Sequence, residues 1–420
     1  MSSKGLLMRL TVDAHNDTLM KIISEDDWSF SADIGLKTDF HIDLDKLATG
    51  QVNVAFFAAF TDDMGNPDLN NSRILSMIQA LDTTVEIHSD QMAKGYDYNG
   101  IIKAIDSHKF VAIQTIEGAY SLSKENALGL LRQYHDLGVR IITLVWDHSN
   151  QIGEGTKKMT ALGESTSGGL TELGKEVVRA MNEIGILVDV SHMDEETFES
   201  TIQTTRKPII ATHSGAYSVK PHVRNLKDSQ LKAVADSGGV VHVVFCRYFI
   251  GDIDSGVEVL VDHIEHIINV IGEDHVGLGS DFDGATMPVD LPDISHIQLV
   301  ARTMKNRGFS KDTIDKVMGL NSLRLIDEMN FSPPSLPENP INLIPGITSH
   351  FEMKSIDLDN AIGALFWLNG VRYDAKIDAL TRNLSFSNDE PLIERFYVAT
   401  FEYTDTSGHI KRTTQIIKNF

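Results

Sequence analysis

Short apolar runs recur along the first three quarters of the chain, and longer amphipathic segments separate them. The runs are rich in Val, Ile and Phe, and several lack the polar alternation of a half-exposed strand. Such runs are typical of strands buried on both faces, as in a parallel sheet. We therefore predict strands at residues 6–13, 52–60, 110–116, 139–146, 185–191, 208–212, 240–246 and 275–280.

The segments between these runs carry helix signals. The helix predicted at 194–205 begins at Asp194 and has Glu195 and Glu196 in its first turn, where negative charge complements the helix dipole. Apolar spacing and end signals predict further helices at 73–93, 126–137, 171–184, 228–237, 256–271 and 310–329.

Eight strands that alternate with helices over residues 1–330 predict an α/β fold, a (β/α)8 TIM barrel. A doubly wound open sheet is the alternative, and the number of strands favours the barrel. No Gly-x-Gly-x-x-Gly motif follows the first strand, which argues against a dinucleotide-binding fold.

The pattern changes after residue 330. The Pro-rich stretch 331–346 predicts a linker or a strap over the barrel, and residues 347–420 predict a small all-β domain. Asn369-Gly370 is a hairpin signal between two apolar segments, and Ser407-Gly408 marks a second turn. This domain could cap the barrel bottom, mediate a homodimer or bind another partner.

Composition narrows the classes of partner. The formal net charge of −22 leaves no basic patch for a nucleic acid or an anionic membrane. The single cysteine, Cys246, excludes an internal disulfide and a cysteine-based zinc cluster. No run approaches the roughly 18 apolar residues of a membrane span, and no signal-peptide pattern precedes the first strand. We expect a cytoplasmic protein.

Residues that bind metals or transfer protons follow five of the eight predicted strands. Alternation along the first strand would place His15 and Asp17 on the same side. The complete set is His15, Asp17, Glu117, His192, His213 and Asp281. Each could instead be a buried pair, a helix cap or a turn residue. Together they predict a metal site, because catalytic groups of such a barrel gather at the C-terminal ends of its strands.

The number and type of these groups suggest two ions. They exceed what one tetrahedral zinc requires, and Glu117 could bridge two ions some ~3.5–4 Å apart. The mixed nitrogen and oxygen donors fit Zn²⁺, with Mn²⁺ or Co²⁺ as alternatives.

These motifs resemble the membrane (renal) dipeptidase family, peptidase family M19. The matching stretches are Asp13-Ala14-His15-Asn16-Asp17, Glu117-Gly118, Ser191-His192, Thr212-His213-Ser214, Ala216-Tyr217-Ser218-Val219, Arg224-Asn225 and Gly279-Ser280-Asp281-Phe282-Asp283-Gly284. They follow the family's order over about residues 10–325. The resemblance implies an amidohydrolase-like barrel with two zinc ions that hydrolyses dipeptides. We expect dipeptides with D-configured C-terminal residues to be among the substrates.

The resemblance also implies roles for single residues. His15 and Asp17 would hold one ion, Glu117 would bridge, and His192 and His213 would hold the other. Asp281 would sit beside the metal-bound water, and we expect it to accept a proton from that water and return it to the leaving amine. Arg224 would bind the C-terminal carboxylate of the substrate; a surface ion pair is its alternative role. Asp13, His41, His222, His242, His263, His266 and His275 are expected to be structural.

The chain departs from the family after residue 143. Some members have a histidine at the end of the fourth strand, predicted here at 139–146, that helps to bind the substrate carbonyl. In this chain Trp146 or Asp147 falls near that point. His148 could serve only after a local shift. The all-β region is also an addition to the usual extent of the family.

Two alternatives to the dipeptidase remain open. The first is an amidohydrolase that acts on another carboxylated amide, an N-acyl amino acid or a lactone. Related barrels of that kind often use His-x-His after the first strand and a carboxylated lysine, so His15-Asn16-Asp17 with Glu117 favours the dipeptidase. The second is a barrel that binds metal, small ligands or a partner without turnover.

Overall fold

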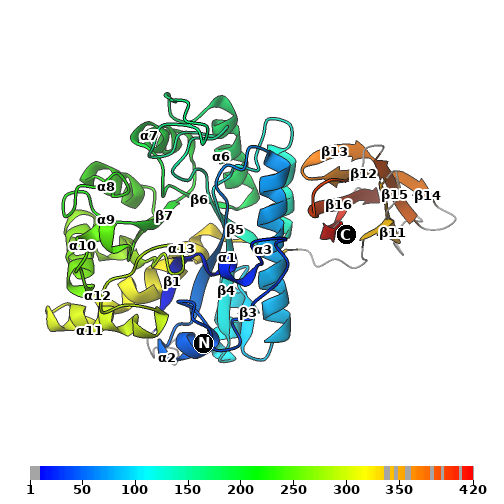
Figure 1. Ribbon diagram of the computed structural model, residues 1–420. Helices are drawn as coiled ribbons and strands as arrows, with labels where there is room; N and C mark the ends of the chain where they lie inside the picture. The colour runs from blue at the N-terminus through cyan, green and yellow to red at the C-terminus, as the bar shows by residue number, and fades with distance from the viewer. Residues whose placement is uncertain are drawn as a thin grey trace.

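A parallel barrel surrounded by helices forms the N-terminal part of the protein (Figure 1). The computed structural model describes residues 10–334, 341–344, 349–354, 361–378, 383–388, 392–405 and 409–419. The barrel strands are β1 (Val12–Asn16), β2 (Val54–Phe60), β4 (Phe110–Glu117), β5 (Val139–Thr143), β6 (Leu187–Asp189), β7 (Ile209–Ser214), β8 (Val240–Val243) and β9 (Val276–Leu278). They pair in this order and in parallel, and β3 (Met92–Lys94) adds to β4. The predicted barrel is confirmed over the doubly wound alternative.

The helices lie on the outside of the strands. They are α1 (Thr18–Ile22), α2 (Leu44–Thr49), α3 (Pro67–Ile87), α4 (Tyr98–Asp106), α5 (Ala127–Asp136), α6 (Glu172–Ile184), α7 (Glu195–Thr204), α8 (Asp228–Asp236), α9 (Arg247–Ile250), α10 (Val257–Ile271), α11 (Gln298–Asn306), α12 (Lys311–Asp315) and α13 (Asn321–Met329), with short helical turns η1 (Glu273–His275), η2 (Ile294–His296) and η3 (Lys316–Leu320). Asp194 caps α7 as expected, since its side chain accepts a hydrogen bond from the Thr197 amide. None of the helices in the described ranges is long and apolar enough to cross a membrane.

The barrel closes through the residues just after its last strand, β9, rather than through β9 itself. β9 is short, and the chain just beyond it pairs with β1. The Asp281 amide donates to the His15 carbonyl at 3.0 Å, and the Asp17 amide donates to the Phe282 carbonyl at 2.8 Å. This closure places Asp281 beside His15, although 266 residues separate them in the sequence.

Two bulges disturb the strand register at the same end of the barrel. On β1 the step from Asp13 to Asn16 covers three positions, whereas the paired step on β2 covers two. β7 has the same extra residue between Ala211 and Ser214. A bulge redirects the side chains that follow it. The first strand was predicted at 6–13 and lies at 12–16, so His15 belongs to the strand itself. The expectation that His15 and Asp17 lie on the same side agrees with the 3.7 Å between His15 Nε2 and Asp17 Oδ2. Residues 6–9 lie outside the described ranges.

The C-terminal strands form two antiparallel sheets. One has the order β10 (Ile341–Ile344), β11 (Ser349–Lys354), β15 (Asn383–Asn388), β14 (Lys376–Asp378), and the other has the order β13 (Val371–Asp374), β12 (Ala361–Leu368), β16 (Phe396–Asp405), β17 (Ile410–Lys418). Asn369 and Gly370 form the predicted hairpin turn, with φ of 46° and 83°. Strand β10 lies inside the stretch predicted as a linker. Ser407-Gly408 lies outside the described residues.

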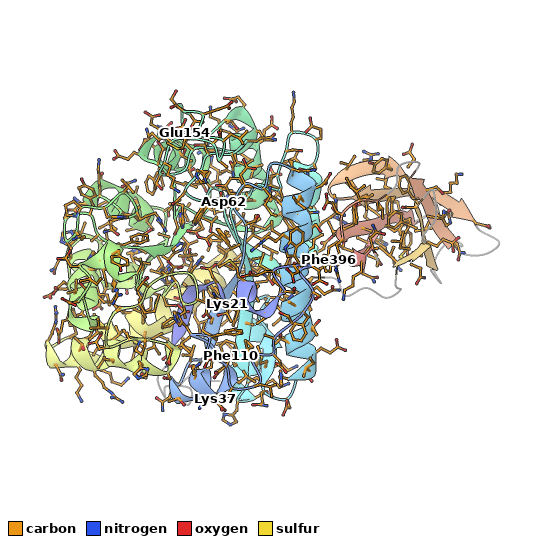
Figure 2. All side chains as sticks on the ribbon, in the orientation of Figure 1. Lys21, Lys37, Asp62, Phe110, Glu154 and Phe396 are labelled. Carbon is orange, nitrogen blue, oxygen red and sulfur yellow. The ribbon has the colours of Figure 1, made fainter. Side chains whose placement is uncertain are left out.

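The sheet of β13, β12, β16 and β17 packs on the side of the barrel, against α3 and α5 (Figure 1). The amide of Phe396, which Figure 2 labels, donates to Ser72 Oγ on α3 at 3.0 Å. The fully buried Gln133 on α5 donates to Thr400 Oγ1 at 2.9 Å and accepts from the Gly370 amide at 2.6 Å. These contacts join the β13–β12–β16–β17 sheet to two helices on the side of the barrel.

Candidate metal centre

Glu117 lies at the centre of the residues that the sequence singled out. It is the last residue of β4, and its side chain is almost completely buried. Its Oε1 lies 2.9 Å from His192 Nε2 and 3.3 Å from His213 Nε2. Its Oε2 faces His15 Nε2 at 3.4 Å. The two oxygens of one carboxylate thus face two separate sets of donors.

The second set extends to two more carboxylates. His15 Nε2 lies 3.7 Å from Asp17 Oδ2, and the donor atoms of His15, Asp17 and Asp281 all lie within 4.8 Å of one another. A similar group joins His15, Glu117 and His213. The structure therefore brings together all six residues predicted at the strand ends. It also places Asp281 where it could hold a cation, besides its predicted role in proton transfer.

These atoms fit a metal better than they fit one another. Buried polar atoms normally have hydrogen-bond partners, but His15 Nε2 and Asp17 Oδ1 are buried without one among the described residues. Two ligands of one tetrahedral zinc, each at ~2.0–2.1 Å, lie about 3.3 Å apart. The spacing of the Nε2 and carboxylate atoms around Glu117 is close to that value. Imidazole nitrogens with carboxylate oxygens are also the donors that zinc accepts.

Burial and neighbouring charges control ionisation in the cluster. Burial opposes ionisation of Glu117, but the charge of His15 and hydrogen bonds from the three histidines hold its pKa well below the usual value. Burial, followed by the negative charge of Asp17, raises the pKa of Asp281 well above the usual value. These two carboxyls of one cluster therefore differ in how readily they release a proton.

Two site residues have strained backbones. His192 and Asp281 have φ of 67° and 66°, in the left-handed region that costs a non-glycine residue about 1–3 kcal/mol. Gly284 follows closely, and a Cβ there would lie 2.0 Å from Asp17 Oδ2 and 2.6 Å from Asp281 Oδ1. Its role in the sequence motif is therefore to let the backbone approach these carboxylates.

Asp147 is a site residue whose role sequence reasoning missed. It follows β5, and its Oδ1 lies 3.1 Å from His192 Nδ1. Burial opposes its ionisation, but the hydrogen bond and charge of His192, then Arg224, hold its pKa well below the usual value. A carboxylate on the far nitrogen of a metal-binding histidine fixes the ring and its tautomer. Its place at a strand end, like those of the other acids, was the available signal.

The neighbours of Asp147 do not replace the missing histidine. His148 Nδ1 pairs with Asp62 at 3.0 Å. Trp146 packs between Phe60 and His192, with ring centroids 5.1 Å and 5.9 Å away. The indole therefore forms an apolar wall beside the candidate centre.

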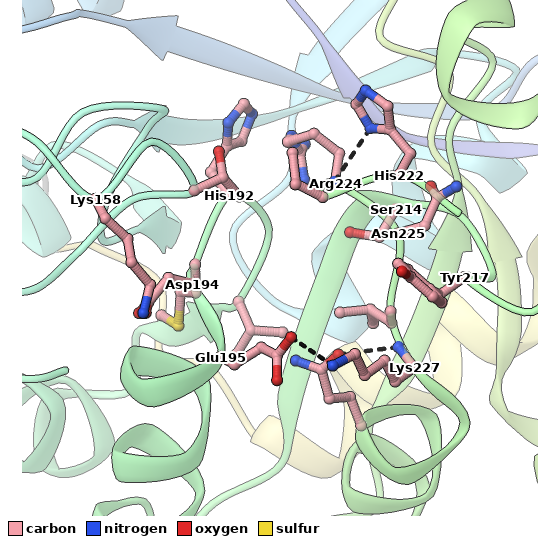
Figure 3. A pocket seen from close by; sticks show the side chains of 16 residues that line it. Lys158, His192, Asp194, Glu195, Ser214, Tyr217, His222, Arg224, Asn225 and Lys227 are labelled. Carbon is pink, nitrogen blue, oxygen red and sulfur yellow. Dashed lines mark hydrogen bonds and ion pairs between the residues drawn. The ribbon is translucent and has the colours of Figure 1, made fainter. Parts of the chain in front are cut away.

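A cavity of about 220 Å³ opens beside His192 (Figure 3). Arg224, His222 and Ser214 line it on one side, and the charged side chains of Lys158, Asp194, Glu195 and Lys227 also line it. Arg224 is only 4 % exposed, so a surface ion pair is excluded. Its Nη2 donates to the His213 carbonyl at 3.2 Å, and its Nε has no hydrogen-bond partner among the described residues. The guanidinium thus retains donors for a ligand in this cavity.

Fold and site together define a class: a barrel hydrolase with metal-binding side chains at the C-terminal ends of its strands. The chain belongs to the membrane dipeptidase family, peptidase family M19, which matches residues 6–338. Membership makes it a metal-dependent dipeptidase.

Curated relatives and solved structures agree with this family. The chain is 31% identical over 330 residues to dipeptidase tcpJ of Claviceps purpurea (strain 20.1), covering 76% of each chain. It is 32% identical over 342 residues to an uncharacterised dipeptidase of Schizosaccharomyces pombe (strain 972 / ATCC 24843), covering 75% of this chain and 79% of that one. The crystal structure of dipeptidase AC, a family M19 metallopeptidase, has a TM-score of 0.70 at 26% identity, over 77% of this chain and 99% of that one.

A second solved structure carries a ligand. A metallopeptidase from Rhodobacter sphaeroides, liganded with a phosphinate mimic of the dipeptide L-Ala-D-Ala, has a TM-score of 0.68 at 25% identity. The match covers 76% of this chain and 99% of that one.

Proposed function

We propose that this dipeptidase uses two zinc ions held on either side of Glu117. The observation that carries the proposal is the division of the Glu117 oxygens, with Oε1 toward His192 and His213 and Oε2 toward His15. His192 and His213 would hold one ion, and His15 and Asp17 the other. Mn²⁺ or Co²⁺ could take the same donors.

When bound, such a pair of zinc ions would provide a water that ionises near neutral pH. The zinc would also polarise the substrate carbonyl. The chain provides the other requirements. Asp281, on the His15 side of the cluster, would take the water proton and pass it to the leaving nitrogen, which cannot depart as an amide anion. The Arg224 guanidinium would bind the C-terminal carboxylate and limit the enzyme to short substrates.

We further propose that the substrates include dipeptides with a D-configured C-terminal residue. The L-Ala-D-Ala mimic in the Rhodobacter sphaeroides relative supports this choice. Arg224 and His192, one of the candidate metal ligands, line the same cavity.

A dipeptide panel combined with metal analysis tests the proposal. The panel pairs L,L with L,D dipeptides and adds N-acyl amino acids as competing substrates. We expect two ions per chain and hydrolysis that a chelator abolishes and zinc restores. A protein with two ions that cleaves no dipeptide would overturn the activity, and a count of one or none would overturn the paired site.

Substitution of Asp281 tests its role separately. Asp281→Asn should keep both ions and lose most of the activity, whereas Asp252→Asn, an exposed acid paired with Lys220, should change neither. Normal turnover by Asp281→Asn would remove the proton-transfer role.

A further inference from the structure

One hydroxyl lies beneath two of the candidate ligands. Thr212 Oγ1 is 2.9 Å from His213 Nδ1 and 3.4 Å from His15 Nδ1. The residue is 1 % exposed, and the two imidazole rings stack with centroids 3.7 Å apart. These two histidines come from opposite halves of the barrel sequence, so the single hydroxyl links β1 to β7.

Asp189 fixes the direction of this hydroxyl. The carboxylate is completely buried, and its Oδ1 accepts the Ser191 and Thr212 amides at 2.9 Å and 3.0 Å. Its Oδ2 accepts the hydroxyls of Thr212 and Thr143 at 2.6 Å and 2.5 Å. Four donors satisfy a carboxylate that can only accept. The one hydroxyl proton of Thr212 is therefore committed to Asp189, and only lone pairs remain for the histidines.

This commitment determines which ring nitrogen of each histidine carries a proton. A lone pair facing Nδ1 requires Nδ1–H, and in the neutral imidazole that binds a metal this leaves Nε2 unprotonated. Nε2 is the atom of both rings that faces Glu117. We propose that Thr212, oriented by Asp189, is a shared positioning residue that holds His213 and His15 in the tautomer that binds metal. The inference rests on the proposed metal site.

Thr143 offers a matched control. Its hydroxyl donates to the same oxygen of Asp189 and is equally buried, but within the described residues it makes no hydrogen bond to a histidine. Thr212→Val and Thr143→Val each remove one hydroxyl without changing the side-chain shape. We expect both metal-free variants to unfold at similarly lowered temperatures, because each leaves the same carboxylate with one donor fewer.

Metal affinity should separate the two variants. In a competition titration of metal-free protein with zinc against a chromophoric chelator, Thr212→Val should bind about 10–100-fold more weakly, the usual effect of losing an outer partner of a metal-binding histidine. Thr143→Val and Thr212→Ser should bind like the wild type. Equal affinity of Thr212→Val and Thr143→Val would overturn the proposal.

Asp189→Asn keeps the proposal testable if Thr212→Val does not fold. With the amide oxygen on the backbone N–H groups, its NH₂ would donate to Thr212 and turn the hydroxyl proton toward the histidines, which favours the wrong tautomer. A folded Asp189→Asn protein should therefore bind zinc more weakly, and wild-type affinity would contradict the inference. A wild type that binds metal but cleaves no dipeptide would overturn only the proposed activity, because the titration does not depend on turnover.

Discussion

Asp147 Oδ1 lies 3.1 Å from Nδ1 of His192, on the opposite side of the ring from the nitrogen that contacts Glu117. A metal-binding histidine is normally held in its orientation by a partner on the far ring nitrogen. The carboxylate supplies that support.

Asp147→Ala should weaken metal binding about 10–100-fold through loss of this support. The measurement is zinc affinity of the metal-free protein. Asp228→Ala is the control, since Asp228 makes a similar contact with His266, at 2.8 Å between the outer helices α8 and α10. The assignment of Asp147 fails if the two variants bind zinc equally well.

Arg224→Lys should raise KM for dipeptides with a free C-terminal carboxylate, because an ammonium cannot reproduce a planar two-pronged contact. Substrates whose C-terminus is amidated should be affected much less. Steady-state kinetics on matched free and amidated dipeptides measure the difference. An equal loss on both would show that Arg224 acts on the fold rather than on the carboxylate.

Gly284→Ala should abolish activity and reduce the metal content, because its Cβ would overlap the Asp17 and Asp281 carboxylates. Gly100→Ala is the control. A Cβ there meets nothing closer than 3.5 Å, and the residue lies in helix α4, where alanine is the better residue by about 0.5–1 kcal/mol. Metal analysis and thermal unfolding of both variants check this. Full metal content in Gly284→Ala would show that the loop can shift.

His242 should make stability fall in mild acid. Burial lowers its pKa from 6.5 to about 4, although a hydrogen bond to the Ala211 carbonyl opposes this shift. Between these pH values the unfolded chain binds more protons than the folded one, so its contribution is complete above pH 6.5 and is lost as the pH falls toward 4. The full effect is about 3 kcal/mol.

The free energy of unfolding of wild type and His242→Gln, compared at neutral and acid pH, tests this contribution. Other titrating groups contribute equally to both proteins. The variant should therefore lose less stability on acidification. Parallel pH profiles would show that His242 is not the group responsible.

Gln133→Ala should loosen the β sheets from the barrel. It removes the partner of the Gly370 amide and of Thr400 Oγ1 in a buried interface, at about 1–3 kcal/mol for a donor left unpaired. Limited proteolysis between residues 330 and 349 should become faster while dipeptidase activity persists. Gln203→Ala, on the exposed face of α7, is the control and should leave the cleavage rate unchanged. An unchanged rate in Gln133→Ala would show that the interface does not depend on the Gln133 side chain.

Sequence pattern was sufficient for the barrel strands and the main helices, and it singled out six residues that the fold brings together. Buried parallel strands need continuous apolar runs. Polar groups that recur at the ends of several such runs indicate one shared site. Asn369-Gly370 likewise predicted its hairpin, because a two-residue turn depends on local backbone preferences alone.

Tertiary structure decided what depends on pairing between distant segments. The bulges on β1 and β7 exist only relative to their neighbouring strands, and they contain His15 and His213. Closure of the barrel brings Asp281 to His15, and the same packing brings Asp147 to His192 and Thr212 to His15. The sequence by itself determined which chemical groups the site contains. Only the folded chain determined which atoms of those groups face one another, because these contacts join residues tens to hundreds of positions apart.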